Sequence, residues 1–340
     1  GSFLSYANRI SEPGKDENRY FSLHYAPRKT QDADPDRERL FYTRENALRI
    51  DAILELIDGE RSGREGTERS LAADVVLASL LYEMSVHVNT SGVMKGYHRG
   101  WGGRGRDALS RILAPIELRP LPLIDGPRGR VTNRPAEALF SPSDTGEYEF
   151  IYADPPYNIH QYGSNYHLLT TAVLGDRYDP GPVERGGRAG IRRDHQRSRF
   201  CQSLRNRENG RRACEAAFEE FVRQIRGRYL LVSYNTDGLI DPREMATILS
   251  QKGRHRVEAR VRKHSKYKGG KNTQSGRRTR EILYRVDLDR GSSSKQLDGT
   301  VELVLREERI GRVLDSYIDP AALPWRGVAH EKGTLLYRNG

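Results

Sequence analysis

The sequence predicts an α/β protein in which a mainly helical region precedes a sheet domain. Up to about residue 128, apolar residues recur at near-helical spacing in two long segments, the pattern of helices with one buried face. From about residue 130, short apolar runs alternate with helix-like segments, which is typical of a sheet covered by helices. We therefore divide the chain into a polar arm or loop at 1–40, a mainly helical subdomain at 41–128, an α/β domain at 129–290 and a C-terminal extension at 291–340.

Two helices account for the apolar spacing of the helical subdomain. Thr43 is placed to cap the first helix and Gly59 to end it, and the second is expected to start at Thr67. The glycine-rich, basic stretch 96–105 is expected to be a flexible loop. The proline-rich stretch 115–127 is expected to be extended and to close the subdomain.

The α/β domain is expected to contain four strands. In chain order, its elements are a buried strand at 150–153, a helix around 218–225, a strand at 229–234, a helix at 243–251, and strands at 257–261 and 281–286. A glycine- and serine-rich turn at 291–294 then leads into the C-terminal extension, to which we assign no structure.

Charge and cysteine content limit the class of protein. The 57 Lys and Arg exceed the 46 Asp and Glu and give a net charge of +11 in 340 residues, which suggests a polyanionic partner. Cys201 and Cys214 lack metal-ligand spacing, so we expect no metal and a reducing, cytoplasmic setting. The sequence has no run of 18 apolar residues and no signal-peptide core in its first twenty, so we expect a soluble protein with no membrane partner.

The segment Asp154-Pro155-Pro156-Tyr157 directly follows the apolar run 150–153. A carboxylate and a main-chain carbonyl held by proline geometry, that of Pro155, can accept two hydrogen bonds from one exocyclic amino group of adenine, and this turns the nitrogen lone pair away from the ring. Tyr157 offers an aromatic face to an unstacked base. The alternative is a strand that ends in a Pro-Pro turn with Tyr157 as a rim aromatic.

The residues after this tetrapeptide make the pattern specific. Residues 154–167 read Asp-Pro-Pro-Tyr-Asn-x-x-Gln-Tyr-x-x-Asn-Tyr-His and resemble the motif IV region of N6-adenine DNA methyltransferases of the Dam-like, FokI-type class. Residues 41–53 and 78–90 resemble the helical region before that motif, and 231–239 resemble its motif VI strand and loop. The resemblance covers about residues 30–288.

The resemblance implies a fold, an activity and a set of site residues. The fold would be the Rossmann-like sheet of S-adenosylmethionine-dependent methyltransferases with a helical DNA-recognition subdomain. The activity would be site-specific N6 methylation of an adenine flipped out of double-stranded DNA, with S-adenosylmethionine as methyl donor, in a bacterial restriction-modification setting. Asp154, Pro155, Pro156 and Tyr157 would be catalytic, and Asp154 would also contact the cofactor. Residues expected to contact DNA are Asn158, Gln161, Tyr162, Asn165, Arg192, Arg193, Arg197, Lys266, Lys268 and Lys271.

Two basic segments supply many of these DNA contacts. Residues 185–212 hold ten arginines against Asp194 and Glu208, and residues 252–281 hold twelve Lys or Arg against two glutamates. Most charge runs are simply solvated faces. Because each segment follows a motif that would face the substrate, we interpret both as phosphate-binding segments.

The chain departs from the family pattern where the cofactor should bind. The family has a Phe-x-Gly-x-Gly loop after its first strand, and no such segment occurs here; residues 100–105 are glycine-rich, but no apolar strand precedes them. The acidic cofactor-contact position falls near 133–137, where Pro135 stands. Three explanations are open: an N-terminal third removed before Gly1-Ser2, which resemble a tag remnant; a second subunit that supplies the missing motif; or a non-catalytic DNA-binding subunit of a methyltransferase or restriction-modification complex. The presence of both Asp154 and Tyr157 favours the first two.

Overall fold

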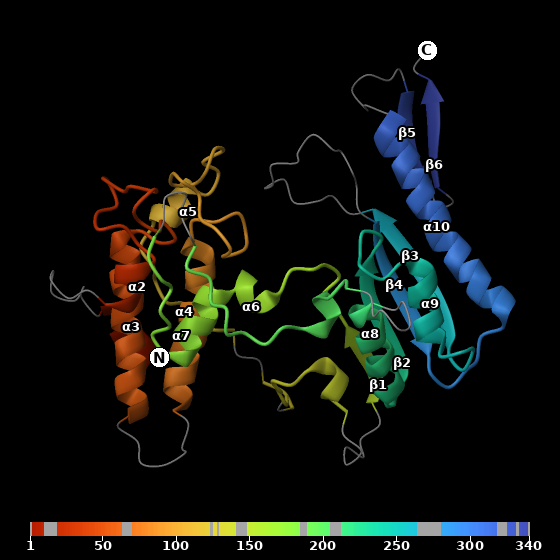
Figure 1. Ribbon diagram of the computed structural model, residues 1–340, viewed down its shortest axis with the longest axis horizontal. Coiled ribbons are helices and arrows are strands. Elements are labelled where there is room, and N and C mark those ends of the chain that lie inside the picture. The colour runs from red at the N-terminus through yellow and green to blue at the C-terminus, as the bar shows by residue number, and fades with distance from the viewer. Residues whose placement is uncertain are drawn as a thin grey trace. The chain divides into compact units, whose positions relative to one another are not determined.

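The chain forms two compact units, and each is described by itself. The computed structural model describes residues 2–9, 19–62, 70–122, 125–127, 129–140, 148–183, 189–204, 212–263, 280–317, 325–330 and 333–338. Unit 1 comprises Gly1–Arg130 and Gln161–Arg197, and unit 2 comprises Val131–His160 and Ser198–Gly340. The chain therefore leaves unit 1 before the Asp-Pro-Pro-Tyr segment, returns to it directly afterwards, and then completes unit 2 (Figure 1).

Unit 1 is helical in the part that the structure describes. Its helices are α1 (Ser2–Arg9), α2 (Tyr20–His24), α3 (Arg44–Ser62), α4 (Leu71–His87), α5 (Leu109–Leu113), α6 (Tyr162–Asn165) and α7 (His167–Leu174). Helices α3 and α4 are the two that the apolar spacing predicted, and they pack against each other.

The caps of α3 and α4 agree only in part with the sequence pattern. Thr43 Oγ1 accepts a hydrogen bond from the backbone N of Asn46 at 3.1 Å, which confirms the predicted cap of α3. Gly59 does not end the helix, because α3 continues to Ser62 and the space around Gly59 is open. Helix α4 begins after Ser70, whose Oγ accepts from Ala73 N at 3.2 Å; the predicted start at Thr67 lies outside the described residues.

Several residues of the range 19–40 lie in the core of unit 1, whereas the sequence led us to expect a polar arm or loop at 1–40. Phe21 and Tyr25 are fully buried and pack with the apolar faces of α3 and α4. The Asp51 carboxylate accepts hydrogen bonds from the backbone N atoms of Phe21 at 2.8 Å and Ser22 at 2.9 Å, and so joins α2 to α3. The segment was expected to be polar because charged residues dominate its composition, and the two aromatic residues were not recognised as core residues.

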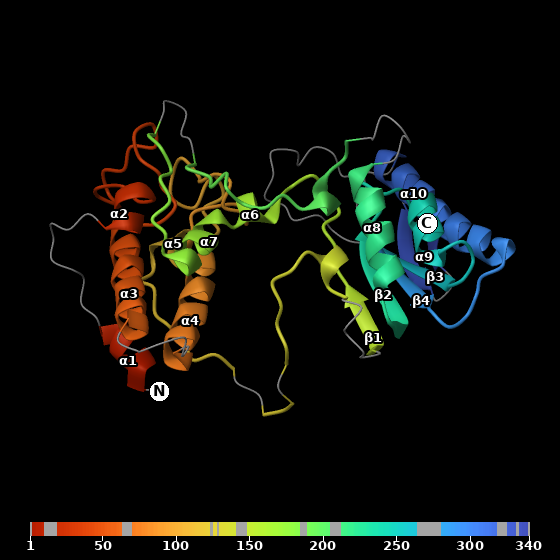
Figure 2. The same ribbon diagram turned by 60° about the horizontal axis from the view of Figure 1, so that its bottom comes forward.

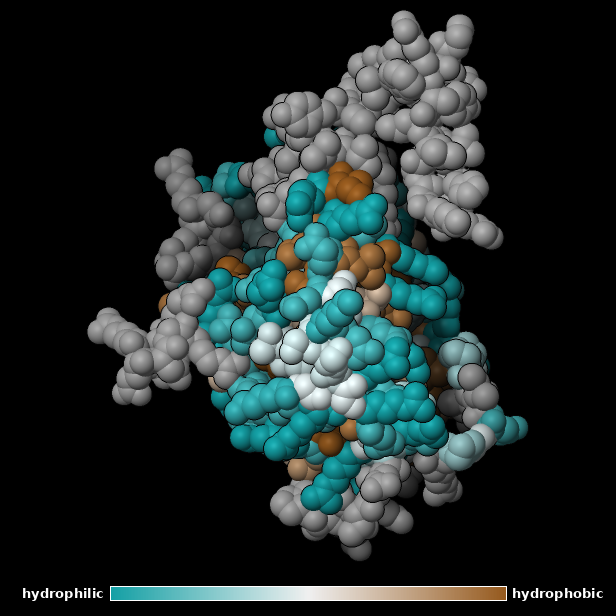
Figure 3. Space-filling view, turned by 90° about the vertical axis from the view of Figure 1, so that its right-hand side faces the viewer, coloured by the Kyte–Doolittle hydropathy of each residue, from teal (hydrophilic) through white to brown (hydrophobic). Residues whose placement is uncertain are grey.

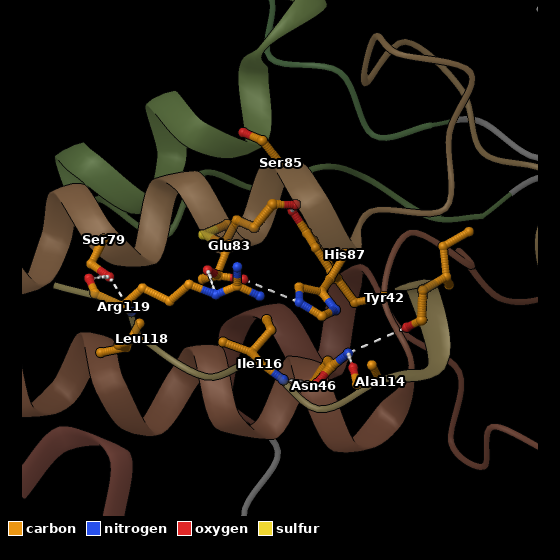
Figure 4. A network of polar contacts seen from close by, with 12 residues as sticks. Tyr42, Asn46, Ser79, Glu83, Ser85, His87, Ala114, Ile116, Leu118 and Arg119 are labelled. Carbon is orange, nitrogen blue, oxygen red and sulfur yellow. Dashed lines mark hydrogen bonds and ion pairs between the residues drawn. The ribbon is translucent and has the colours of Figure 1, made fainter. Parts of the chain in front are cut away.

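A network of buried polar contacts holds the extended segment after α5 against α3 and α4 (Figure 4). Asn46 donates to the carbonyl of Ala114 at 2.9 Å and accepts from Ile116 N at 2.9 Å. Ser79 makes two hydrogen bonds with the backbone of Arg119, at 2.8 and 3.0 Å. Each side chain thus replaces the strand partner that an extended segment would otherwise need. This part of the proline-rich stretch is extended, as the sequence predicts.

The glycine-rich stretch 96–105 is tied into unit 1 by specific hydrogen bonds. Trp101 Nε1 donates to the carbonyl of Thr30 at 3.0 Å, and Gly102 N donates to Asn89 Oδ1 at 3.1 Å. Gly102 and Gly103 both have positive φ, which glycine adopts without strain. These glycines therefore shape a defined turn, and the expectation of a flexible loop is not met.

Unit 2 is built on a mixed four-stranded sheet. Its elements are η1 (Ala136–Ala138), β1 (Tyr148–Ala153), η2 (Arg199–Cys201), α8 (Ala213–Gln224), β2 (Gly227–Asn235), α9 (Pro242–Ser250), β3 (Arg256–Lys263), β4 (Arg280–Asp287), α10 (Ser294–Tyr317), β5 (Trp325–His330) and β6 (Gly333–Arg338). The sheet order is β1-β2-β4-β3 (Figure 2). Strands β1 and β2 are parallel and the other pairs antiparallel. The four predicted strands are confirmed, whereas α10 and the β5–β6 pair had no sequence prediction.

One face of this sheet carries the core of unit 2. Register partners Ile151, Leu230 and Val286 lie on it, and the helices α8, α9 and α10 contribute apolar side chains to the same core. Helix α10 packs on β3 and α9. The outer surface of this region is mainly hydrophilic, with small scattered hydrophobic areas (Figure 3).

Strand β1 is not the buried strand that its apolar sequence predicted. Tyr148, Phe150 and Tyr152 are 52%, 55% and 57% exposed. They alternate with Ile151 and Ala153, which face the core, so they share the opposite face. Sequence periodicity could not separate a strand buried on both faces from one at the edge of the sheet.

No helix among the described residues is long and apolar enough to span a lipid bilayer.

Candidate active site

The Asp-Pro-Pro-Tyr segment lies at the carboxyl end of β1. Strand β1 ends at Ala153, and Asp154 follows it with an exposed side chain. Pro155 and Pro156 are half-buried, and the Tyr157 ring is 38% exposed. A carboxylate and an aromatic ring are thus presented at the edge where parallel strands of α/β sheets usually place ligands.

The parallel partner of β1 brings a second loop to the same edge. Ala153 is paired with Val232, so β2 ends beside the Asp154 segment and continues into the loop 235–241. The backbone N of Leu239 donates to the carbonyl of Tyr157 at 2.9 Å. The rings of Tyr157 and Tyr234 meet edge to face, with centroids 6.4 Å apart and planes at 83°. Tyr157 is therefore held through both its backbone and its side chain.

Tyr234 is the buried support of this arrangement. Its ring is 3% exposed and its hydroxyl accepts a hydrogen bond from Ile240 N at 3.2 Å. Burial raises the pKa of Tyr234 to about 12, so the hydroxyl stays protonated at neutral pH. A Cβ atom on Gly238 would lie 2.2 Å from Cε1 of Tyr234, so the loop can follow this path only with glycine there.

The turn after β2 is closed by its own polar groups. Asn235, which is 4% exposed, accepts a hydrogen bond from Asp237 N through its side chain at 3.1 Å and from Gly238 N through its carbonyl at 3.2 Å. Thr236 N donates to the carbonyl of Arg280 at 3.0 Å, which joins the turn to the start of β4. The loop that faces Tyr157 is therefore fixed by the sheet. The motif VI resemblance covered these residues without indicating which of them is the support.

The residues after Tyr157 continue along the surface of unit 2. Asn158 is half-buried, and its Oδ1 accepts from His160 N at 2.9 Å in a short side-chain turn. The buried Cys201 Sγ donates to the carbonyl of His160 at 3.4 Å. The cysteine is thus used in packing and local hydrogen bonding in unit 2.

Unit 1 holds the remaining described residues for which DNA contacts were predicted. Tyr162, Arg193 and Arg197 are exposed and Gln161 is half-buried, so these four side chains are accessible. Asn165 is only 7% exposed, and its carbonyl accepts from Met94 N at 2.7 Å, so its side chain lies mostly inside unit 1. Lys266, Lys268 and Lys271 lie outside the described residues.

Arg192 has a structural environment that does not fit the predicted phosphate contact. Its side chain is 3% exposed and forms paired hydrogen bonds with Asp176, at 2.7 and 2.5 Å, and with Asp194, at 3.0 and 2.6 Å. The guanidinium also lies over the Tyr178 ring, 4.7 Å from its centroid. These hydrogen bonds raise the pKa of Arg192 and lower the pKa of both carboxyl groups. Two carboxylates already occupy the donors that a phosphate would need.

The described residues around Asp154 form only one side of a site for S-adenosylmethionine. Within the described part of unit 2, β1 has a strand neighbour on one edge only, and no glycine-rich loop adjoins its carboxyl end. A cavity of about 460 Å³ is lined by Arg19, Asp51, Glu55 and other residues of α2, α3 and α7. That cavity belongs to unit 1, whereas Asp154 belongs to unit 2. The described residues around Asp154 therefore do not by themselves form a site that fits S-adenosylmethionine.

Comparison with known proteins shows which family the chain resembles. Residues 15–181 match the model of D12 class N6 adenine-specific DNA methyltransferases. Three type II methyltransferases are similar to the chain. M.FokI from Planomicrobium okeanokoites is 30% identical over 256 residues, which are 74% of this chain and 35% of M.FokI. M.NlaIII from Neisseria lactamica is 27% identical over 64% of this chain and 58% of its own length. M.CviAII from Paramecium bursaria Chlorella virus 1 is 28% identical over 73% of this chain and 64% of its own length.

The chain spans less than two thirds of the length of each of these relatives. No solved structure matches it. The matched residues include most of unit 1, strand β1 and the Asp154–Tyr157 segment, and the family uses S-adenosylmethionine as its methyl donor. Over residues 15–181, the chain is similar to the D12 class of N6 adenine-specific DNA methyltransferases.

Proposed function

We propose that the chain is the target-base and DNA-recognition part of a site-specific DNA adenine-N6 methyltransferase. The observation that carries this proposal is the geometry at the end of β1, where an exposed carboxylate and a supported aromatic ring are separated by two prolines. The family match supports the choice of adenine N6 as the acceptor. The association with a restriction-modification system and the cytoplasmic location are part of the same proposal.

The catalytic contribution of this chain is to orient the amino group of a flipped adenine. The Asp154 carboxylate accepts one of its hydrogen bonds and the Pro155 carbonyl accepts the other. Two acceptors at one nitrogen favour a tetrahedral geometry with its lone pair directed away from the ring. Pro156 restricts the backbone between them, and the ring of Tyr157 stacks on the base. Since the amino nitrogen loses its proton readily once alkylated, Asp154 has no need to be a strong base.

Contacts with the duplex come from both units. In unit 1, Tyr162, Arg193 and Arg197 are exposed and suited to contact the phosphate backbone of DNA. Gln161 and Asn158 follow the Asp154 segment directly and contact the same strand. Lys266, Lys268 and Lys271 keep the role that the sequence predicts for them. Arg192 and Asn165 are left out of this set because of their burial and pairing.

A second function has one observation in its favour. Because the described residues around Asp154 do not complete a cofactor site, the chain could serve as a non-catalytic DNA-binding subunit. Calorimetric titration with S-adenosylmethionine separates the two functions. The chain is titrated with and without a partner that supplies the missing cofactor segment. Heat of binding in the presence of that partner supports the methyltransferase. No heat of binding in either titration supports the non-catalytic subunit.

The methyltransferase assignment is tested in a bacterial strain that has no adenine methylation of its own. The chain is expressed with the part of M.NlaIII that lies outside the region similar to this chain, and the DNA is sequenced by a method that reads N6-methyladenine. We expect methylation at one short sequence, and we expect Asp154→Ala to abolish it while the protein remains folded. Methylation that persists in Asp154→Ala would reject the proposed role of the carboxylate.

A further inference from the structure

Helix α8 begins after Arg212, a residue type that is unfavourable at this position. An N-cap side chain normally accepts a hydrogen bond from a backbone N–H of the first helical turn, and a guanidinium has no acceptor atom. Its positive charge also lies at the end of the helix where the macrodipole favours negative charge. A residue that breaks a local rule in this way is expected at a functional site. The reason for an arginine here must therefore lie outside the helix.

Glu215 satisfies the start of α8 in place of the Arg212 side chain. The backbone N of Arg212 donates to Glu215 Oε2 at 2.9 Å, which is the contact that a glutamate at the third helical position makes in a capping box. Glu215 Oε1 also lies 3.8 Å from Arg212 Nε, so the carboxylate offsets the positive charge at the helix N-terminus. The helix therefore starts here without a contribution from the guanidinium.

The guanidinium binds the loop that supports Tyr157. Arg212 Nη1 donates to the carbonyl of Leu239, and the backbone N of Leu239 donates to the carbonyl of Tyr157 at 2.9 Å. Leu239 therefore joins Arg212 to Tyr157 through its two polar backbone groups. The next residue, Ile240, donates to the hydroxyl of Tyr234 at 3.2 Å, and the ring of Tyr234 meets that of Tyr157 edge to face. Arg212 thus holds the loop on which both contacts of Tyr157 depend.

The first residues of the loop 235–241 are fixed by the sheet, whereas the residues after them depend on side chains. Asn235 and Thr236 hold the turn against the start of β4. The backbone groups that follow are bonded to Arg212 and to the Tyr234 hydroxyl. A hydrogen bond from a guanidinium to a carbonyl is charge-assisted and about twice as strong as a neutral one. Because the Arg212 side chain is only 30% exposed, water competes little for this bond.

We propose that Arg212 is a positioning residue of the target-base site, which holds Tyr157 in place for an extruded adenine through the backbone of Leu239. The inference rests on the proposed function, because that function places the base on the Tyr157 ring. Arg212 ends the basic segment 185–212, for which the sequence predicted phosphate contacts, but its side chain binds a carbonyl of its own chain. Loss of Arg212 should therefore impair methyl transfer and leave the salt dependence of DNA affinity unchanged.

Two substitutions separate positioning from the stability of α8. Serine is a favourable N-cap residue, so Arg212→Ser should preserve or improve the start of the helix while it removes the hydrogen bond to Leu239. Arg212→Lys keeps a cationic donor and should retain part of that bond. The matched control is Arg223→Ala, which removes an exposed arginine from the last turn of the same helix, at the end opposite to Arg212.

Hydrogen exchange of the complete 340-residue chain, followed by NMR, tests the link directly. In Arg212→Ser the amide of Leu239 should exchange about tenfold faster, while the amide of the buried Val232 on β2 should exchange as in the parent. Val232 thereby controls for a general loss of stability. A 3-fluorotyrosine label at position 157 should show a changed ¹⁹F resonance in Arg212→Ser and an unchanged one in Arg223→Ala.

Methyl transfer measures the consequence for the reaction. The chain is mixed with the part of M.NlaIII that lies outside the region similar to it, and transfer of a tritiated methyl group to plasmid DNA is followed. Arg212→Ser should lower kcat about tenfold with little change in the KM for DNA, and Arg212→Lys should lower it less. Three results would overturn the inference: parent-like exchange of Leu239 in Arg212→Ser, equal losses of kcat in the serine and lysine variants, or a salt slope reduced by about 0.9 in Arg212→Ser, which would make Arg212 a phosphate contact.

The parent chain separates this inference from the proposed function. Methyl transfer by the parent that continues at the same kcat in Arg212→Ser would uphold the methyltransferase and reject the positioning role. If the parent transfers no methyl group, the methyltransferase is rejected. Faster exchange of Leu239 with a changed resonance at position 157 would then still uphold the control of Tyr157 by Arg212.

Discussion

At the scale of single residues, the site depends on support from side chains that the sequence did not single out. Asp154 and Tyr157 were predictable because a short motif carries them. The contact of Tyr157 with Tyr234, and of Tyr234 with Gly238, joins positions about 80 residues apart. Such contacts follow from the pairing of β1 with β2, which periodicity alone does not specify. Arg192 is the opposite case: the sequence predicted it as a site residue, but the structure uses it for ion pairs within unit 1.

Gly238→Ala tests the support of Tyr157. The added Cβ would lie 2.2 Å from the Tyr234 ring, so either the ring or the loop must move, and we expect a loss of about 1–3 kcal/mol in the free energy of unfolding. Urea unfolding of the 340-residue chain measures it.

The matched control is Gly299→Ala in α10, where no atom lies within 4 Å of the new Cβ. Alanine in a helix is favoured over glycine, so this variant should gain about 0.5–1 kcal/mol. Equal effects of the two substitutions would show that the Tyr234–Gly238 contact does not constrain the loop.

At the scale of elements, the sequence predicted whether a segment is a helix or a strand better than it predicted how deeply that segment is buried. Helices α3 and α4 and the four strands were predicted, since each has a long or alternating apolar pattern. The exposure of β1 and the burial of Phe21 and Tyr25 were not predicted, because burial depends on which element packs nearby. Helix α7 is a further example. It begins at His167, which is fully buried and makes a 2.8 Å hydrogen bond from Nε2 to the carbonyl of Met94.

Acid should weaken the packing of α7 through His167. Burial lowers the pKa of His167 to about 4, and the nearby charges of Arg192 and Arg39 act in the same direction, against the opposing effect of the Met94 hydrogen bond. The unfolded chain binds a proton at His167 near pH 6.5, whereas the folded chain does not until about pH 4. Stability is therefore complete above pH 6.5 and falls as pH decreases between these values, by about 2 kcal/mol from pH 7 to pH 5.

Urea unfolding at several pH values measures this dependence in the parent and in His167→Gln. The glutamine amide can still donate to the Met94 carbonyl but does not titrate, so the variant should lose about 2 kcal/mol of the pH dependence. The same slope in both proteins would show that His167 is not the titrating group.

At the scale of the whole molecule, the net charge of +11 and the family both point to DNA, but only part of that charge is available. Arg192 forms ion pairs with Asp176 and Asp194. Arg285 of β4 forms an ion pair with Glu258 of β3. Arg193 and Arg197 are exposed. Sequence composition predicted the class of partner, whereas the structure indicates which arginines can reach it.

The salt dependence of DNA affinity distinguishes these groups. Each phosphate neutralised by a side chain releases a counterion and contributes about 0.9 to the slope of log K against log salt concentration. The double variant Arg193→Ala with Arg197→Ala should therefore reduce the slope by about 1.8, and Asp154→Ala should leave it unchanged, because the carboxylate contacts a base.

Arg285→Ala is the matched control, since it removes an arginine that is paired on the sheet of unit 2. Fluorescence anisotropy of labelled duplex DNA between about 50 and 200 mM salt measures the slopes. If Arg285→Ala lowered the slope as much as the double variant, the basic surface would act through total charge, and the assignment of phosphate contacts to Arg193 and Arg197 would fail.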